Sequence, residues 1–234
     1  MRLAVIPARG GSKRIPRKNI KPFCGKPMIA WSIDVAKASG CFDRIIVSTD
    51  DEEIADVARA HGAEVPFMRP QELSDDYTGT IPVVAHAVQH MSEQVGQVQY
   101  ACCLYATAPF VRAQDLRKGF EVLQQSNAQY AFTVTNFAAP IQRAFRITEF
   151  ERIEMFNPGH FQTRSQDLEE AYHDAGQFYW GSASAWLAEI PLYSEFASPI
   201  VLPRYRVQDV DTMDDWTRAE LMFEILNKTT ERKS

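Results

Sequence analysis

The chain has 234 residues, of which 45% are hydrophobic and 24% charged. This composition is typical of globular proteins and excludes disordered, collagen-like and repeat-built chains. No stretch approaches the roughly 18 apolar residues of a membrane span, and the apolar start Leu3–Ile6 runs into Arg9 without the form of a signal peptide. The four cysteines lack metal-ligand spacing, so we expect reduced thiols in a cytoplasmic protein with no membrane partner.

The charges are distributed unevenly along the chain. Thirty acidic and 25 basic residues give a net charge of −5, which argues against a nucleic-acid partner. Residues 1–33 nevertheless contain eight lysines and arginines and no acid, whereas the remainder has 17 basic and 30 acidic residues. A positive cluster on an acidic body suits a compact, highly charged anion such as a triphosphate.

Short apolar runs alternate with helical patterns over the first 135 residues. The runs predict strands at Leu3–Ile6, Ile45–Ser48, Ala63–Phe67, Tyr100–Leu104 and Tyr130–Thr135. The helical patterns lie at about Pro27–Ser39, Asp51–His61, Thr80–Met91 and Ala113–Ser126. Such alternation predicts one α/β domain over residues 1–234, with a doubly wound, mostly parallel, Rossmann-like sheet.

The alternation stops at a long insertion. Residues 136–175 are polar and show no clean period, and such an excursion from a compact domain is usually functional or contacts a partner. Regular structure is expected again at Phe178–Trp180, at Ile200–Leu202 and in a closing helix over Met213–Asn227. We expect the tail Thr229–Ser234 to be frayed.

The segment Ile6–Asn19 follows the first predicted strand, so it lies at the edge of the sheet where open α/β folds bind ligands. Gly10 and Gly11 allow backbone N–H groups to approach phosphate oxygens, and Ser12 adds a hydroxyl. The cations able to neutralise phosphate charge are Arg9, Lys13, Arg14 and Lys18. The segment is neither a P-loop nor a G-x-G-x-x-G dinucleotide motif. The alternative is a basic loop that simply faces water.

With these motifs the chain resembles the CMP-sugar synthetases, the cytidylyltransferases that activate nonulosonic acids such as sialic acid. The resemblance covers nearly the whole chain and also includes Phe42–Asp50, Arg69–Asp76 and Asp209–Asp211. It implies a nucleotidyltransferase fold. It also implies transfer of CMP from CTP to the anomeric hydroxyl of a 2-keto sugar acid, with release of pyrophosphate.

The resemblance also implies roles for individual residues. The triphosphate of CTP is expected to bind Ala8, Arg9, Gly10, Gly11, Ser12, Arg14, Lys18 and Asn19. Cytosine and ribose are expected near Arg69, Thr78 and Thr80, with a surface cation as the alternative for Arg69. The residues expected to act in catalysis are Arg9, Lys18, Asp209 and Asp211.

Asp209 and Asp211 are two positions apart, which in an extended segment places both carboxylates on one face about 6–7 Å apart. Hard oxygen ligands at this spacing suit Mg²⁺ bound jointly with phosphates. Alternatively, Asp211 or Thr212 caps the following helix and Asp215 completes a capping box, and both interpretations can hold together. No residue in these motifs is an evident general base.

The sugar site departs from the pattern of the sialic acid enzymes, in which a glutamine takes the place of Tyr105. The expected sugar contacts are Tyr105, Thr107, His173 and Tyr179. This more apolar and aromatic set favours pseudaminic acid, with sialic or legionaminic acid as alternatives. His173 has the alternative of a core or surface histidine.

Arg164 and Gln166 match the excursion whose residues reach a neighbouring subunit's site in the family. This implies a homodimer with composite sites, and a solvated hairpin is the alternative. Two other function classes also remain open at this stage. One is a non-catalytic nucleotide-binding protein, and the other is a nucleotidyltransferase that accepts a sugar-1-phosphate.

Overall fold

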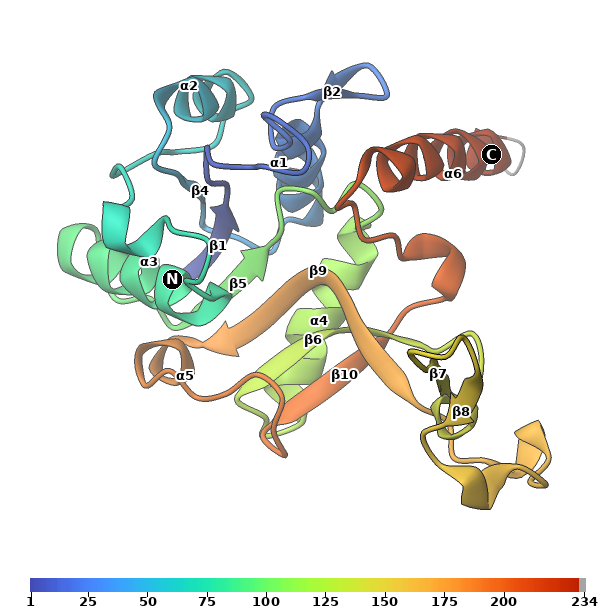
Figure 1. Cartoon of the computed structure of the whole chain (residues 1–234). Coiled ribbons are helices and arrows are strands. Elements are labelled where there is room, and N and C mark those ends of the chain that lie inside the picture. Colours follow the sequence, from blue (N-terminus) through green and yellow to red (C-terminus); the bar gives the residue numbers. More distant parts are fainter. Residues whose placement is uncertain (232–234) are drawn as a thin grey trace.

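The computed structural model describes residues 1–231 and contains a central sheet of six strands (Figure 1). The strand order is β10-β6-β9-β5-β1-β4. The bounds are β1 Arg2–Pro7, β4 Arg44–Ser48, β5 Tyr100–Leu104, β6 Tyr130–Asn136, β9 Tyr172–Ser182 and β10 Ala197–Val201. The pairs β1–β4, β1–β5 and β10–β6 are parallel, whereas β9 is antiparallel to both β5 and β6. The prediction of a mostly parallel sheet is therefore confirmed.

Helices cover both faces of this sheet, as a doubly wound fold requires. One face packs against α1 (Met28–Ser39), α2 (Glu52–Ala60) and α4 (Ala113–Gln125). The other packs against α3 (Thr80–Gln94) and the short α5 (Ala183–Leu187). The neighbours Cys102 and Cys103 accordingly belong to different halves of the core, and all four cysteines are free.

A third, smaller core brings the end of the chain back to its beginning. The hairpin of β2 (Pro22–Phe23) and β3 (Lys26–Pro27) packs against α6 (Met213–Glu231). The ring of Phe23 meets those of Trp216 and Phe223 edge-on, with centroids 5.4 Å apart in both pairs. This packing places the loop before α6 beside the first loop.

One prediction about local structure is wrong. Ala63–Phe67 forms no strand: Glu64 makes an isolated bridge to Ile46, and the next bridge, Thr49–Met68, lies just beyond the run. Pro66 lies within this run and lacks the N–H that a ladder needs. At the other end, α6 extends to Glu231, beyond the predicted end of the closing helix at Asn227, and the fraying of Thr229–Ser234 stays a prediction. Residues 232–234 lie outside the described part of the chain.

The predicted insertion is an arm between β6 and β9, residues 137–171 (Figure 1). It contains a hairpin of β7 (Phe145–Ile147) and β8 (Ile153–Met155). Its short 3₁₀ turns are η2 (Ile141–Arg143), η3 (Pro158–His160) and η4 (Ser165–Asp167), and the main domain has two more, η1 (Gln71–Leu73) and η5 (Arg204–Arg206). Within residues 1–231, no helix is long and apolar enough to cross a membrane.

Candidate active site

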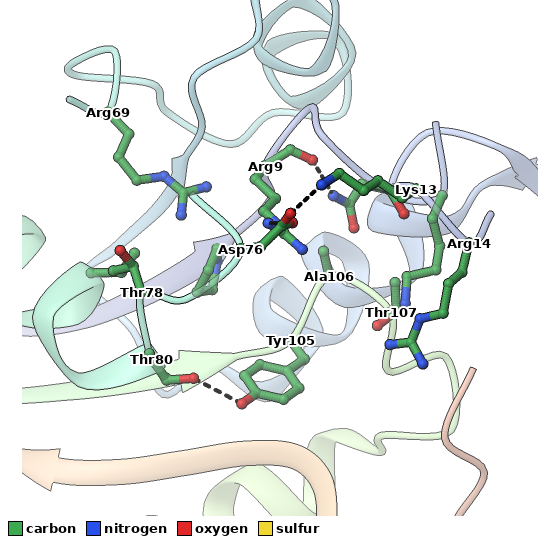
Figure 2. A pocket seen from close by; sticks show the side chains of 16 residues that line it. Arg9, Lys13, Arg14, Arg69, Asp76, Thr78, Thr80, Tyr105, Ala106 and Thr107 are labelled. Carbon is green, nitrogen blue, oxygen red and sulfur yellow. Dashed lines mark hydrogen bonds and ion pairs between the residues drawn. The ribbon is translucent and has the colours of Figure 1, made fainter. Parts of the chain in front are cut away.

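A polar cavity of about 480 Å³ opens where β1 and β5 end, at the edge of the sheet where open α/β folds bind ligands (Figure 2). Two groups of predicted residues line it. From the first loop come Arg9, Ser12, Arg14, Lys18 and Asn19. From later segments come Arg69, Thr78, Thr80, Tyr105 and Thr107. The fold therefore brings together residues that are up to about a hundred positions apart in the chain.

The first loop has a fixed shape rather than that of a basic loop facing water. Asn19 is buried and its side-chain amide donates to the carbonyl of Arg9 at 2.9 Å. The guanidinium of Arg17, a residue with φ of 57°, binds both oxygens of Asp51 at 2.5 and 2.9 Å. The N–H of Gly10 donates to Asp50 at 2.9 Å. Ala8 is buried and the N–H of Gly10 is already bound, and the predicted phosphate contacts Ala8, Gly10 and Gly11 do not line the cavity.

Asp76 is a cavity residue that the sequence analysis missed. Its carboxylate accepts from Arg9 at 2.6 Å and pairs with Lys13 (Figure 2). The hydrogen bonds from Lys13, first, and Arg9 hold the pKa of Asp76 below its usual value. Asp76 belongs to the motif Arg69–Asp76, but it was not selected because an acid does not have the chemistry of a phosphate ligand.

Arg69 is buried, so the alternative of a surface cation is wrong. One of its terminal nitrogens donates to the carbonyl of Ser48 at 2.9 Å, while its Nε has no protein partner. Burial lowers the pKa of this guanidinium. A buried, incompletely paired arginine on a cavity wall has donors available for a ligand carbonyl.

A second cavity of about 460 Å³ adjoins the first and shares Gly79, Thr80 and Tyr105 with it. The hydroxyls of Thr80 and Tyr105 are hydrogen-bonded at 2.9 Å (Figure 2). The remaining wall is apolar and aromatic and consists of Ile81, Pro82, Tyr179, Pro191, Leu192 and Tyr193. Tyr193 and Leu192 were missed because they lie in a segment without any motif.

The late acidic pair lies beside the first loop, as expected. Lys18 Nζ donates to the carbonyl of Val210 at 2.7 Å and lies 3.4 Å from Asp211, which also pairs with Arg14 at 2.8 Å. Desolvation, and then the charge of Asp211, raise the pKa of Asp209. Asp211 therefore contacts two cations of the cavity wall, Arg14 and Lys18, although neither Asp209 nor Asp211 lines the cavity itself.

Asp215 and Thr212 form the alternative capping box at the start of α6. Asp215 accepts from the N–H of Thr212 at 2.9 Å, and Thr212 Oγ1 accepts from the N–H of Asp215 at 3.2 Å. Because these residues provide the cap, the carboxylates of Asp209 and Asp211 are not needed for it. Two carboxylates next to a cavity lined by cations fit Mg²⁺, which commonly takes one or two protein carboxylates and completes its shell with phosphates and water.

Residues 3–183 match the family model described as Cytidylyltransferase. The match covers well over half of the chain. The chain belongs to the cytidylyltransferase family.

Relatives of this cytidylyltransferase match over nearly its whole length. It is 47% identical to a pseudaminic acid cytidylyltransferase of Campylobacter jejuni over 95% of this chain and 96% of the relative. It is 30% identical to a CMP-N,N'-diacetyllegionaminic acid synthase of Legionella pneumophila, with the same coverage of both chains. Among solved structures, a CMP:2-keto-3-deoxy-manno-octonic acid synthetase complexed with CTP matches with a TM-score of 0.71 at 15% identity, covering 95% of this chain and 98% of that one. This last similarity supports the fold alone.

Three predicted sugar contacts of the cytidylyltransferase line neither cavity within one chain. Arg164 and Gln166 are exposed on the arm, where Arg164 pairs with Asp167 at 2.7 Å. His173 lies at the exposed start of β9, with its ring against Phe137 and its Nδ1 2.8 Å from the carbonyl of Asp174. Of the histidine interpretations, the structure of the single chain supports the surface one.

Proposed function

We propose that this cytidylyltransferase transfers CMP from CTP to the anomeric hydroxyl of a nonulosonic acid, pseudaminic acid above all, and releases pyrophosphate. The observation that carries the proposal is the pair of adjoining cavities that share Thr80 and Tyr105. One is lined by cations and suits a triphosphate, and the other is lined by apolar and aromatic groups and suits an acylated sugar.

In this mechanism the sugar hydroxyl attacks the α-phosphorus, a new O–P bond forms, and the bond to the leaving pyrophosphate breaks. Arg9, Arg14 and Lys18 bind phosphate oxygens and stabilise the negative charge that shifts onto the pyrophosphate. Their own partners keep them in place before the nucleotide arrives, because Asp76 holds Arg9 and Asp211 holds the other two. Because the two cavities share a wall, both reactants are held next to each other, and this positioning supplies the rest of the rate enhancement.

We propose Asp209 and Asp211 as the ligands of Mg²⁺, which when bound supplies charge neutralisation to the phosphates. We expect Asp211→Asn to lower kcat/KM by about 100-fold or more and to raise the Mg²⁺ concentration needed for half-maximal rate. Asp214→Asn is the matched control, since Asp214 is an exposed acid on the first turn of the same helix. Equal activity of both variants over a Mg²⁺ titration contradicts the metal role.

The choice of pseudaminic acid rests on the apolar second cavity and on the 47% identical relative of that name. Burial raises the pKa of Tyr105 to about 12, so its hydroxyl is neutral and available for hydrogen bonding at physiological pH. The more distant likeness to a legionaminic acid enzyme leaves that acid as the second candidate.

We further propose a homodimer in the cytoplasm. The arm exposes eight large apolar side chains, a composition suited to burial against a second copy. These residues are Phe137, Ile141, Phe145, Ile147, Phe150, Ile153, Phe156 and Phe161. Arg164 and Gln166 then extend towards the partner's sugar site. Four free cysteines suit a reducing compartment.

The deciding experiment incubates the protein with CTP, Mg²⁺ and a panel of sugar acids while pyrophosphate is followed. We expect release with pseudaminic acid and weaker or no release with sialic and legionaminic acids. Release only with one of the latter two assigns that activity instead. Binding of CTP without any release identifies a nucleotide-binding protein, and release with a sugar-1-phosphate identifies the other class of nucleotidyltransferase.

A further inference from the structure

Asp174 lies next to the second cavity at an irregularity of β9. Phe132 of β6 pairs with Tyr179, but Val134, two positions on, pairs with Asp174, five positions back along β9. Gly176, within this bulge, has a φ of 60°, a conformation that other residues adopt with strain. In a regular strand Asp174 and Tyr179 point to opposite faces because their separation is odd. The bulge instead brings their side chains together.

The carboxylate of Asp174 binds three donors. Its Oδ1 accepts from the N–H of Gly176 at 2.8 Å. Its Oδ2 accepts from the hydroxyl of Tyr179 at 2.5 Å and from that of Tyr193 at 2.7 Å. Tyr179 is almost completely buried, whereas Tyr193 belongs to a largely exposed segment and retains 71% of its accessible surface. Asp174 therefore links Tyr179, on the sheet, to Tyr193, in the segment after α5, and both tyrosines line the second cavity.

These contacts set the direction of the hydrogen bonds. A carboxylate only accepts, so both tyrosines must donate their single hydroxyl proton to Asp174. Their oxygens then have only lone pairs left for a ligand. Beside them, one of the paired hydroxyls of Thr80 and Tyr105 donates to the other, so this pair has one further proton to donate, either to the neighbouring oxygen of Tyr179 or to a ligand.

The second cavity thus combines acceptors, one further donor and an apolar lining, which is the complement of an N-acyl amino group. The N–H of such a group needs an acceptor, its carbonyl needs a donor and its alkyl end needs apolar contact. Ile81, Pro82 and Leu192 supply that contact. We infer that Asp174 is a positioning residue that turns the hydroxyls of Tyr179 and Tyr193 into acceptors for the N–H of an acylamino substituent on the sugar acid. This inference rests on the proposed function.

Asp174→Asn tests the inference because it preserves size and alters the direction of donation. If the new amide nitrogen at this position faces the tyrosines, it donates to their oxygens, and their hydroxyl protons turn toward the ligand. If it faces Gly176, the amide N–H and the backbone N–H of Gly176 are two donors without an acceptor between them. We expect the KM for pseudaminic acid to rise about 10-fold or more, while the KM for CTP stays within about twofold. Asp56→Asn, which removes an exposed carboxylate on α2, is the matched control and is expected to change neither constant.

Tyr193→Phe removes one of the two acceptors and keeps the Tyr179 contact, so we expect a smaller rise in the KM for the sugar acid. Because both residues act through one hydrogen-bonded group, the double variant is expected to show less than the product of the single effects. Unchanged sugar KM in Asp174→Asn, or a parallel rise in both KM values, overturns the inference. Melting temperatures of all variants separate these outcomes from general unfolding.

Failure of the proposed function and failure of the inference about Asp174 give different results. If the wild-type protein releases no pyrophosphate with any sugar acid, the proposed function is wrong, and the role of Asp174 in linking Tyr193 to Tyr179 is measured by limited chymotrypsin digestion. Faster cleavage at Tyr193 or Phe196 in Asp174→Asn than in Asp56→Asn supports the link. Equal cleavage rates overturn it.

Discussion

Gly10 and Gly11 are neighbours in the first loop with different surroundings. A Cβ added to Gly10 meets Oδ2 of Asp51 at 2.7 Å and its Cβ at 2.9 Å, whereas one added to Gly11 meets nothing within 4 Å. We therefore expect Gly10→Ala to displace the loop, to lower the melting temperature and to weaken CTP binding. Gly11→Ala is expected to retain the wild-type melting temperature. Thermal melts with and without CTP measure both effects, and equal loss of stability in the two variants contradicts this difference.

Arg69 is the residue whose replacement should act most selectively on the nucleotide. Lysine preserves the charge but lacks the planar fork, whose two terminal nitrogens contact the carbonyls of Ser48 at 2.9 Å and Leu73 at 3.5 Å and still have N–H groups left for a ligand. We expect Arg69→Lys to raise the KM for CTP by about 10- to 100-fold, the equivalent of one charged hydrogen bond. The KM for the sugar acid should change little. A selective rise in the KM for the sugar acid would instead show that Arg69 acts on the sugar acid and not on the nucleotide.

At the scale of elements, Asp51 connects α2 to the first loop. It caps the helix by accepting from the N–H of Ile54 at 3.0 Å, and it also binds Arg17. The hydrogen bond from Arg17, first, lowers the pKa of Asp51 below its ordinary value of 3.8. Because the folded pKa is the lower one, its stabilising contribution is fully present above the ordinary value. It is lost as the pH falls through the folded value.

Asp51→Ala removes both interactions, and the lost cap alone costs about 1–2 kcal/mol, which corresponds to a fall in melting temperature of roughly 2–8 °C. Asp51→Asn keeps a capping oxygen and loses only the charge, so we expect a smaller fall that shrinks as the pH approaches the acidic range. Thermal melts over a pH series measure this, with Glu52→Gln as the control on the same turn. A stability difference that does not vary with pH rules out the ion pair as its cause.

The elements also show what could be predicted from the sequence. Local patterns located at least part of each strand of the six-stranded sheet and the helices α1–α4 and α6, because each pattern depends on neighbouring residues. The length of the apolar run alone wrongly predicted a strand at Ala63–Phe67, where Pro66 prevents ladder pairing. The insertion of β9 between β5 and β6 was not predictable, since it pairs residues about 40 to 80 positions apart and depends on the three-dimensional fit of the sheet.

The site residues also divide into those that could be predicted from the sequence and those that could not. Cations and glycines in a motif were found because their chemistry matches a phosphate. Asp76, Asp174 and Tyr193 were missed because each acts by holding another protein group, and such a role is visible only when the partner's position is known. In the sequence, an acid that orients a cation or a tyrosine looks the same as one that faces water.

At the scale of the whole molecule, the proposed homodimer depends on the arm. Phe145 and Phe150 are 55% and 75% exposed, on and beside the β7–β8 hairpin. We expect the double change Phe145→Glu, Phe150→Glu to convert the dimer to monomer, because burying two charges without partners is costly. Light scattering after gel filtration measures the mass. Leu221→Glu, at an exposed position of α6, is the control, and a double variant with the wild-type mass shows that the interface lies elsewhere.

If the sites are composite, subunits with defects in different halves complement each other. Arg164→Ala damages the site of the partner, whereas Asp211→Ala damages the subunit's own site. A mixed dimer therefore contains one intact and one doubly damaged site, and random mixing restores about a quarter of the wild-type sites. We expect mixing, by unfolding and refolding the two variants together, to give more activity than the sum of the two separate preparations. Activity equal to that sum means that Arg164 serves no site across the interface.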